Sequence, residues 1–412
     1  MEQKEIVSNK ILPTKKSAKK LKLAIIYPEL NCKRGSQNVV MWCANLLDKT
    51  KYDITLFTKS INLDLWNEYK NEFEIKLLDN KIFGFYAVKS SYIQAFLYKN
   101  IFKKQLSKFD IVFTHNYPTN VWVYHALKNI RNKPYIIYYC QEPRRLLWGY
   151  LTDSHQQELN KYYNLENTKP KIRKSRQKID ILATKFCDKI LCNSNFSKLN
   201  IKKIYNLDAD ICLLGIAKKN NNIISINKRP NNLIALLPFE YAKNPLVIVK
   251  TIDYLVNKCN FTDFRLYLIG KGHLNELIIN FIKEKNIEKF VELKDYINEE
   301  EKQELLNNSK IGLYLTIDEP FGLTVLEYMQ YGLISIVSDH GGPSEIISNN
   351  KTGFLVNPFD EKQIGDKIIN ILTTHNFENI SKNAIEEVNQ KFLLNHFIER
   401  LEKYLLFQNI PS

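Results

Sequence analysis

Apolar, strand-like runs alternate with helix-like segments along most of this chain of 412 residues. The first round contains LKLAIIY, DITLF, DIVFTH, YIIYYC and KILCNS, and the second contains LIALLPF, FRLYLIG, FVELKDY, IGLYLTI, LISIVSD and TGFLV. Strands that alternate with helices pair in parallel, and helices then cover both faces of the sheet. Such sheets bind ligands at the carboxyl ends of their strands, so functional residues are expected in the loops that follow the strands.

A polar stretch with few apolar residues, KKNNNIISINKRPNN, separates the two rounds at residues 218–232. Such an interruption is typical of an interdomain linker. The sequence therefore predicts an α/β protein with a basic flexible arm at residues 1–20, a Rossmann-like doubly wound domain at 21–217 and a second at 233–385. The two domains would face each other across a cleft. A C-terminal helix is expected at residues 386–412, packing back on the first domain.

Charge is distributed unevenly between the two rounds. Residues 1–225 carry 39 Lys and Arg against 19 Asp and Glu, a net charge of +20, whereas the rest of the chain holds 20 basic and 25 acidic residues. The densest basic cluster is KPKIRKSRQK at residues 169–178. A basic half indicates an anionic partner such as an anionic membrane surface, with a merely solvated face as the alternative. The sequence contains no recognisable nucleic-acid-binding module, so nucleic acid is not expected as a partner.

Two further features bear on location. The sequence has no apolar run of the roughly 18 residues that a spanning helix needs, and its first twenty residues are Lys-rich, so neither a spanning helix nor a signal peptide is expected. The 7 cysteines form no CxxC pair, which favours reduced thiols in a cytosolic protein over a zinc site. A cytoplasmic protein, peripheral at the inner face of the cytoplasmic membrane, fits these features and the basic half.

The stretch EPFGLTVLE, Glu319 to Glu327, opens and closes on a carboxylate. Pro320 suits the first turn of a helix, and apolar residues follow at helical spacing. Glu319 is then expected before the helix and Glu327 on its body, up to about 12 Å away, so that the two acids would bind separate parts of one long ligand. Free backbone N–H groups at Gly322 and Leu323 would suit a diphosphate. A capped surface helix with a solvated Glu is the alternative.

This region resembles the retaining GT-B glycosyltransferases of the large family that includes bacterial mannosyltransferases and glycogen and sucrose synthases. The resemblance covers residues 21 to 385 and is most specific in EPFGLTVLEYMQYGLISIVSDHGGPSEIISNNKTGFLV, which meets the E-x7-E motif of that family. It implies a GT-B fold, contact of Glu319 with hydroxyls of the transferred sugar, and contact of Glu327 with the nucleotide ribose. It also implies that the sugar and diphosphate of the donor lie along Phe321, Gly322, Leu323 and Thr324.

In the first domain, YCQEPRRLLWG at residues 139–149 resembles the segment YCHSPxRYLWD of bacterial mannosyltransferases. Arg145 matches that segment, whereas its histidine is Gln141 here, and a neutral amide cannot act as a general base. Both residues are candidates for the acceptor side. His115, at the end of DIVFTH, is either a further acceptor contact or a structural histidine. The chemistry can survive the change at Gln141, because in this class the donor phosphate is thought to deprotonate the acceptor.

Two phosphate-binding elements of the family are altered in this sequence. The paired glycines before the first helix read Arg34 and Gly35, and the Gly-Arg-x4-Lys clamp keeps only its lysine, Lys243. Pro238 stands where the clamp Arg belongs, so a bidentate phosphate ligand is missing. Arg34 is a candidate replacement from across the cleft. Gly270, in the turn GKGH, is a further candidate donor contact.

The residues and the resemblance together predict a metal-independent retaining glycosyltransferase without a cofactor. Lys243 would stabilise the charge that develops on the diphosphate, and Glu319 would be the other catalytic residue. GDP-mannose is the first candidate donor and a UDP-hexose the second, and the acceptor would be a glycan or a lipid-linked acceptor. The alternative is a catalytically impaired GT-B protein that binds nucleotide, glycan or a partner without turnover, an interpretation that Pro238 and Gln141 favour.

Overall fold

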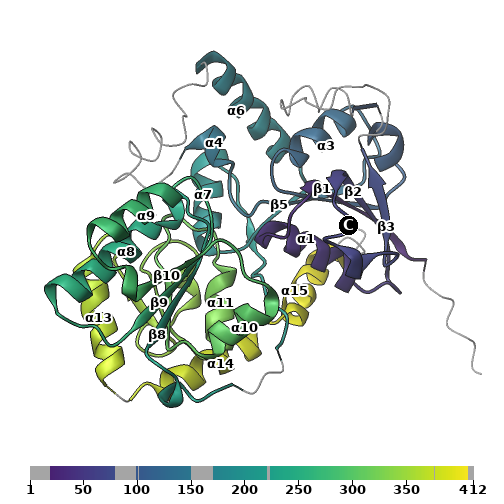
Figure 1. Cartoon of the computed structure of the whole chain (residues 1–412). Coiled ribbons are helices and arrows are strands. Elements are labelled where there is room, and N and C mark those ends of the chain that lie inside the picture. Colours follow the sequence, from purple (N-terminus) through teal and green to yellow (C-terminus); the bar gives the residue numbers. More distant parts are fainter. Residues whose placement is uncertain are drawn as a thin grey trace, which may run out of the picture.

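Two parallel sheets, each with helices packed on both faces, make up the computed structural model of this chain (Figure 1). The structure describes residues 19–78, 99–100, 102–149, 170–219, 223–374 and 376–406. The predicted basic arm therefore lies almost entirely outside the described residues. The predicted α/β class with two Rossmann-like units in a GT-B arrangement is confirmed.

Among the described residues, the sheet of the N-terminal domain has seven parallel strands in the order β3-β2-β1-β4-β5-β6-β7. The strands are β1 (Leu21–Leu30), β2 (Tyr52–Ile61), β3 (Glu74–Leu77), β4 (Ile111–His115), β5 (Tyr135–Tyr139), β6 (Lys189–Cys192) and β7 (Asp210–Ile211). All five runs predicted for this domain form strands. The edge strands β3 and β7 are additional, because their sequences, EIKL and DI, contain charged residues and have no continuous apolar run.

Six parallel strands form the sheet of the C-terminal domain, in the order β10-β9-β8-β11-β12-β13. They are β8 (Asn232–Leu236), β9 (Arg265–Ile269), β10 (Val291–Lys294), β11 (Ile311–Tyr314), β12 (Ile334–Ser338) and β13 (Phe354–Val356), which match the six predicted runs. Every residue of β11 and β12 is buried, as expected of central strands that helices cover on both faces.

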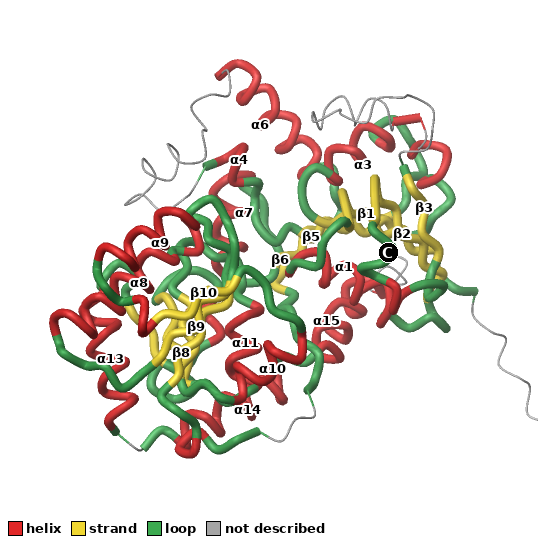
Figure 2. The backbone as a smooth tube through the Cα atoms, viewed as in Figure 1, coloured by secondary structure: helices red, strands yellow, loops and turns green. Residues whose placement is uncertain are grey.

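Helices flank the strands of each domain on both sides (Figure 2). Those of the N-terminal domain are α1 (Gly35–Leu46), α3 (Thr119–Leu127), α4 (Arg145–Trp148), α6 (Pro170–Lys185) and α7 (Asn195–Tyr205). Those of the C-terminal domain are α8 (Pro245–Asp253), α9 (Asn275–Glu284), α10 (Glu299–Asn307), α11 (Leu323–Gln330), α12 (Pro343–Ile346), α13 (Glu361–Thr373) and α14 (Glu378–Lys391). None of the helices in the described part of the chain is long and apolar enough to cross a membrane.

The segment predicted as one helix from residue 386 onward is interrupted. α14 ends at Lys391, and a separate helix, α15 (Leu394–Leu406), follows it. The break has a backbone cause, because Ile216 pairs with the intervening residues: its N–H donates to Phe392 O (2.8 Å) and its carbonyl accepts from the N–H of Leu394 (3.0 Å). The chain passes from the N-terminal to the C-terminal domain near Ile216 and returns near Leu393. These two connecting segments therefore lie side by side.

The last helix, α15, lies against α1 of the N-terminal domain (Figure 1). Its buried residues Phe397, Leu401 and Leu405 share one core cluster with residues of α1. At the edge of this contact, Lys51 Nζ lies 2.9 Å from a carboxylate oxygen of Glu402. The helix therefore belongs to the N-terminal domain in space, although it follows the C-terminal domain in sequence.

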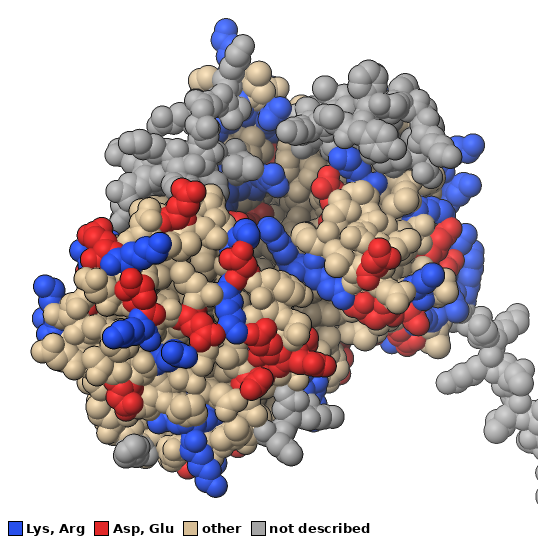
Figure 3. Space-filling view, in the orientation of Figure 1, with Lys and Arg blue, Asp and Glu red and all other residues tan. Residues whose placement is uncertain are grey.

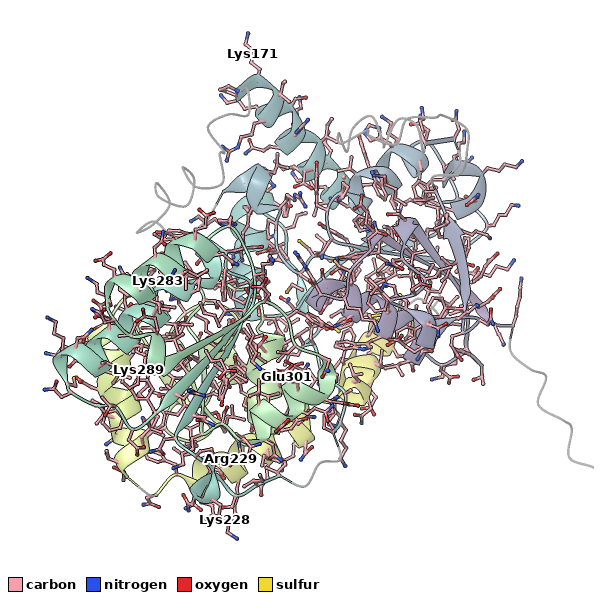
Figure 4. The ribbon with its side chains drawn as sticks, viewed as in Figure 1. Lys171, Lys228, Arg229, Lys283, Lys289 and Glu301 are labelled. Atoms are coloured by element: carbon pink, nitrogen blue, oxygen red, sulfur yellow. The ribbon has the colours of Figure 1, made fainter. Side chains whose placement is uncertain are left out.

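The second half of the predicted linker is bound to the C-terminal domain through Arg229, labelled in Figure 4. The side chain of Arg229 is buried, and its guanidinium donates hydrogen bonds to four backbone carbonyls. These carbonyls belong to Ile224, Leu306, Ser309 and Tyr331. Burial lowers the pKa of Arg229 to about 10, so it stays charged at neutral pH. This part of the segment is therefore a fixed connection within the described residues.

Candidate active site

Glu319 lies in the loop between β11 and α11, beyond the carboxyl end of a central strand. Gly322, the residue before α11, has a φ of +104°, a conformation that residues with a side chain rarely adopt. The helix starts at Leu323, so the prediction that Pro320 occupies its first turn is wrong. The left-handed turn at Gly322 causes the difference, because it separates Pro320 from the helix. Glu319 lies before the helix, as predicted.

The Gly-Gly-Pro turn after β12 packs against the loop that carries Glu319. The N–H of Gly342 donates to the backbone carbonyl of Glu319 at 2.8 Å. A Cβ at residue 342 would lie 2.0 Å from Pro320 O, and one at residue 341 would lie 2.9 Å from Glu319 O. Both distances are too short for a side chain, so the paired glycines permit the two loops to meet backbone to backbone. The turn thereby sets the position of Glu319.

The ammonium group of Lys243 forms an ion pair with the carboxylate of Glu319. Lys243 ends a short 3₁₀ helix, η4 (Tyr241–Lys243), which follows β8. Burial alone would raise the pKa of Glu319, but the charges of Lys243 and Arg145 more than offset it, so the pKa of this carboxyl lies below its usual value. The structure thus brings the two predicted catalytic residues together, with the acid ionised.

Glu327 projects from α11 into a cavity of about 530 Å³ between the two domains. Thr324 and Leu323 line the same cavity. A carboxylate oxygen of Glu327 lies 3.1 Å from the Nζ of Lys302, on α10. Burial would lower the pKa of Lys302, but Glu327 and Glu299 together raise it, so this lysine is charged when it pairs with Glu327. One oxygen of Glu327 is thereby engaged by a cation of the same domain.

The start of α1 faces the start of α11 across this cavity. Arg34 and Gly35 are exposed and line the cavity from the N-terminal domain. A Cβ at Gly35 would lie 3.4 Å from Leu323 Cδ1, so the two helix starts are within van der Waals distance. The first N–H groups of a helix have no partner within it and attract anions. Two such ends on the wall of one cavity, with Arg34 beside one, favour a negatively charged group in that cavity.

Two other residues predicted to contact the donor, Phe321 and Gly270, are packed into the protein interior. Phe321 is 3% exposed, and its ring lies 6.4 Å from that of Phe392 in the core. Gly270 packs so closely that a Cβ there would lie 1.9 Å from Leu237 O. The structure thus accounts for both residues by packing, and it does not place the Phe321 ring at the cleft surface.

Arg145 reaches across the domain boundary from the start of α4. Its guanidinium donates to the backbone carbonyl of Asp318, and its Nε donates to Glu142 at 2.7 Å. Gln141 lies close by, and its backbone carbonyl accepts a 2.5 Å hydrogen bond from Ser197 Oγ. Of the predicted acceptor-side residues, Arg145 is therefore the one that the structure brings to the Glu319 loop.

His115 lies in the core, beneath the cleft surface. It is 0% exposed, and its ring packs among those of Tyr27, Phe113 and Tyr139. Burial lowers the pKa of His115 to about 3, so the ring is neutral at physiological pH. This geometry favours the structural role over an acceptor contact.

Sequence reasoning did not single out Lys302, Glu142 or Glu345. Glu142 and Glu345 both lie in the stretches quoted for the family resemblance, YCQEPRRLLWG and HGGPSEII, but at positions to which the resemblance assigns no role. Lys302 follows three consecutive glutamates, a pattern typical of any exposed helix. Only the packing of the two domains reveals that these side chains border the cleft.

Comparison with known proteins agrees with this geometry. The model of the family described as glycosyl transferases group 1 matches residues 217–388, and that of glycosyltransferase family 4 matches residues 33–214. The alpha-1,3/1,6-mannosyltransferase ALG2 of Dictyostelium discoideum is 26% identical over 94% of this chain and 98% of its own length. Its namesake in Rhizomucor pusillus is 23% identical over 95% and 92%.

Solved structures share the fold at lower identity. Sucrose-phosphate synthase from Thermosynechococcus elongatus has a TM-score of 0.76 and 14% identity, covering 95% of this chain and all of its own. HepE of Anabaena, in complex with UDP and glucose, has a TM-score of 0.71 and 13% identity over 95% of this chain and 100% of its own. Two Rossmann-like domains that face each other across a cleft are the architecture of the GT-B glycosyltransferases. With the two family matches, one to each domain, they identify the chain as a GT-B glycosyltransferase of the group 1 type that uses a nucleotide sugar.

Proposed function

We propose that this protein is a retaining hexosyltransferase that moves mannose from GDP-mannose to a glycan or lipid-linked acceptor. The observation that carries the proposal is the ion pair between Lys243 and Glu319, which lies just before the start of α11. Arg145 of the other domain contacts the same loop through the backbone carbonyl of Asp318. Relatives named as mannosyltransferases match nearly the whole chain, which supports mannose as the transferred hexose. A UDP-hexose is the second candidate donor.

In this proposal the donor extends along α11. Glu319 binds hydroxyls of the hexose, and Glu327 accepts hydrogen bonds from the ribose. The diphosphate lies at the start of α11, where Lys243 and the helix N–H groups stabilise the charge that builds up as the anomeric C–O bond breaks. Because Lys243 and the helix supply this positive charge, the proposed reaction is independent of a metal ion.

We further propose that α6 brings the acceptor domain to an anionic membrane surface. One end of this helix extends away from the two sheets, and Lys171 lies at that end, in the first turn of α6 (Figures 1 and 4). Lys171, Lys174 and Lys178 are exposed and recur at helical spacing on one face of α6. Lys and Arg side chains also border the hollow between the two lobes (Figure 3). Basic side chains at a surface attract anionic lipids by about 1 kcal/mol each.

One assay tests the transferase. The purified chain is incubated with a panel of GDP- and UDP-sugars, with mannose-terminated oligosaccharides as acceptors, and released nucleotide and the anomeric configuration of the product are measured. GDP release from GDP-mannose with an α-linked product supports the proposal. An inverted product would contradict retention. Nucleotide-dependent thermal stabilisation without any release would instead favour the catalytically impaired binder.

A further inference from the structure

Asp180, on α6, is a buried carboxylate to which the proposed reaction assigns no role. It is 0% exposed and accepts hydrogen bonds from three neutral side chains. Its Oδ1 accepts from Asn120 Nδ2 at 2.9 Å, and its Oδ2 accepts from both Trp148 Nε1 and Tyr205 OH at 2.8 Å. A buried polar network whose members are satisfied rigidifies the elements that it joins. Asp180 therefore fixes the groups that donate to it.

The shared oxygen of Asp180 joins the ends of two helices. Trp148 is the last residue of α4, and Tyr205 is the last residue of α7. Their rings also pack edge to face, with centroids 5.8 Å apart. Both helices contact α6, and the three lie together beside the C-terminal domain (Figure 1). Because the two donors bind one oxygen, α4 and α7 cannot shift independently of each other.

The starts of the same two helices hold the chain on either side of Glu319. Arg145, the first residue of α4, donates to the backbone carbonyl of Asp318. Ser194, the residue before α7, donates from its Oγ to Pro320 O at 2.6 Å. Asp318 and Pro320 are the immediate neighbours of Glu319 in sequence. The N-terminal domain thus binds the backbone just before and just after this acid of the C-terminal domain.

α4 depends on α6 for its position. It has four residues, and so short a helix is unstable without tertiary contacts. Arg173 Nε and Gln177 Nε2 of α6 both donate to Leu147 O, at 3.0 and 2.9 Å. Together with Asp180 they recur at the spacing of one helix face. Three side chains of α6 therefore hold the end of α4, and the position of Arg145 at its start follows from them.

We propose that Asp180 is a positioning residue for Glu319. It joins the far ends of α4 and α7, and the starts of these helices then hold the Glu319 loop where this acid meets the transferred hexose. The last clause rests on the proposed function, because the contact between Glu319 and the hexose belongs to it. The competing interpretation confines Asp180 to the packing of the N-terminal domain.

Four substitutions separate these interpretations. Tyr205→Phe removes one donor to Asp180 and keeps the ring, so it cuts the link without opening a cavity. Tyr254→Phe is the matched control, because Tyr254 OH donates to Asp366 at 2.8 Å within the C-terminal domain. Asp180→Ala removes the carboxylate, whereas Asp180→Asn keeps one oxygen that can still accept from Trp148 and Tyr205.

Hydrogen exchange measured by mass spectrometry gives a readout that does not depend on activity. Losing a hydrogen bond to a carboxylate corresponds to roughly 10- to 100-fold in a local opening equilibrium. We therefore expect residues 317–322, in the C-terminal domain, to exchange at least about 10-fold faster in Tyr205→Phe than in the wild type. Tyr254→Phe should leave this segment unchanged. A role confined to the N-terminal domain predicts no change there, so equal exchange in Tyr205→Phe and the wild type would overturn the proposal.

A double-mutant cycle on kcat gives the second readout, using GDP release from GDP-mannose with a mannose-terminated oligosaccharide. Ser194 and Tyr205 lie at opposite ends of α7, about 16 Å apart along the helix, and substitutions at such a distance are normally additive. Ser194→Ala and Tyr205→Phe should each lower kcat by roughly 10- to 100-fold through displacement of the Glu319 loop, without changing GDP affinity. The double variant should lose no more than Ser194→Ala alone, because that change already cuts the link. Additive losses would contradict action through Ser194.

The Asp180 variants test the carboxylate itself. Asp180→Asn should retain most of the activity that Asp180→Ala loses, whereas wild-type exchange and kcat in Asp180→Ala would overturn the proposal. If Asp180→Ala does not fold, Tyr205→Phe decides. A wild-type protein that releases nucleotide from no sugar donor would refute the proposed function, while hydrogen exchange still decides whether Asp180 positions the loop. The two failures are therefore distinguishable.

Discussion

The carboxylate of Glu345, in the C-terminal domain, accepts a 2.6 Å hydrogen bond from the backbone N–H of Phe196, in the N-terminal domain. Its other oxygen accepts from the N–H of Asn195 at 2.8 Å. These N–H groups belong to the first two residues of α7, so an acid of one domain caps a helix of the other. Ser194 Oγ adds a 2.6 Å hydrogen bond to Pro320 O. These hydrogen bonds hold the two domains in the arrangement that the structure shows, which we call closed.

Replacing this cap should favour an open arrangement. Hydrogen bonds to a charged group contribute about 1.5–3 kcal/mol, so Glu345→Ala should shift the balance between closed and open forms by roughly 10- to 100-fold. We expect a larger radius of gyration by small-angle X-ray scattering and a lower kcat. Glu386→Ala, on the exposed side of α14, should change neither quantity. Identical scattering curves and rates for Glu345→Ala and wild type would show that the cap does not hold the domains closed.

The two acids of α11 and its preceding loop should differ in their effects. Glu327→Ala removes the proposed ribose contact and should weaken GDP binding, whereas Glu319→Ala removes the proposed sugar contacts and should mainly lower kcat. Loss of a hydrogen bond to a charged group corresponds to about 10- to 100-fold in either quantity. Calorimetry with GDP and steady-state kinetics with GDP-mannose separate the two. Unchanged GDP affinity in Glu327→Ala would contradict its assignment.

Restoring the missing clamp residue should strengthen diphosphate binding. Pro238 follows β8 and is partly exposed, so Pro238→Arg should add about 1.5–3 kcal/mol to GDP binding if no other residue has taken over this function. If Arg34 supplies this charge from across the cavity, the gain should be small and Arg34→Ala should be the damaging change. Calorimetry on both variants decides between the two outcomes. If neither substitution changed the affinity for GDP, we would conclude that neither position 238 nor Arg34 contacts the diphosphate.

The exposed lysines of α6 should control binding to anionic vesicles. Arg173 is not suited to this test, because its Nε donates to Leu147 O at 3.0 Å and supports α4. Changing Lys171, Lys174 and Lys178 to Ser should weaken binding to phosphatidylglycerol vesicles by roughly 100-fold, at about 1 kcal/mol per lysine. Added salt should weaken wild-type binding.

The matched control for α6 changes three exposed lysines of the C-terminal domain, Lys228, Lys283 and Lys289, to Ser (Figure 4). It has the same net charge as the α6 variant, and its co-sedimentation should resemble that of the wild type. Equal loss in both variants would indicate a general charge effect. Binding of the wild type to neutral vesicles would also contradict an electrostatic origin.

Chelators should leave the activity intact. In the proposed reaction Lys243 and the start of α11 stabilise the diphosphate, so the rate of GDP release should be the same within about twofold in EDTA and in Mg²⁺ or Mn²⁺. Complete loss in EDTA that Mn²⁺ restores would contradict the metal-independent mechanism.

The sequence was sufficient to predict every strand except the edge strands β3 and β7, and to assign Lys243 and Glu319 to one donor site, where the structure pairs them. Parallel strands covered on both faces have continuous apolar runs, and their carboxyl ends meet at one edge, so order along the chain predicts proximity. The contacts of Arg145 with Asp318 and of Glu345 with α7 could not be predicted in this way. They depend on how the two domains dock, and no local periodicity encodes that relationship.

The packing of α15 on α1 has a consequence for synthesis of the protein. Residues 394–406 leave the ribosome only after the entire C-terminal domain, yet Phe397 and Leu401 fill the core beside α1. Until then α1, whose residues Val39, Val40, Met41, Cys43 and Ala44 are buried in the complete structure, lacks the helix that packs against it. The domain that is translated first is therefore completed last, because this part of its core can form only after α15 has been synthesised.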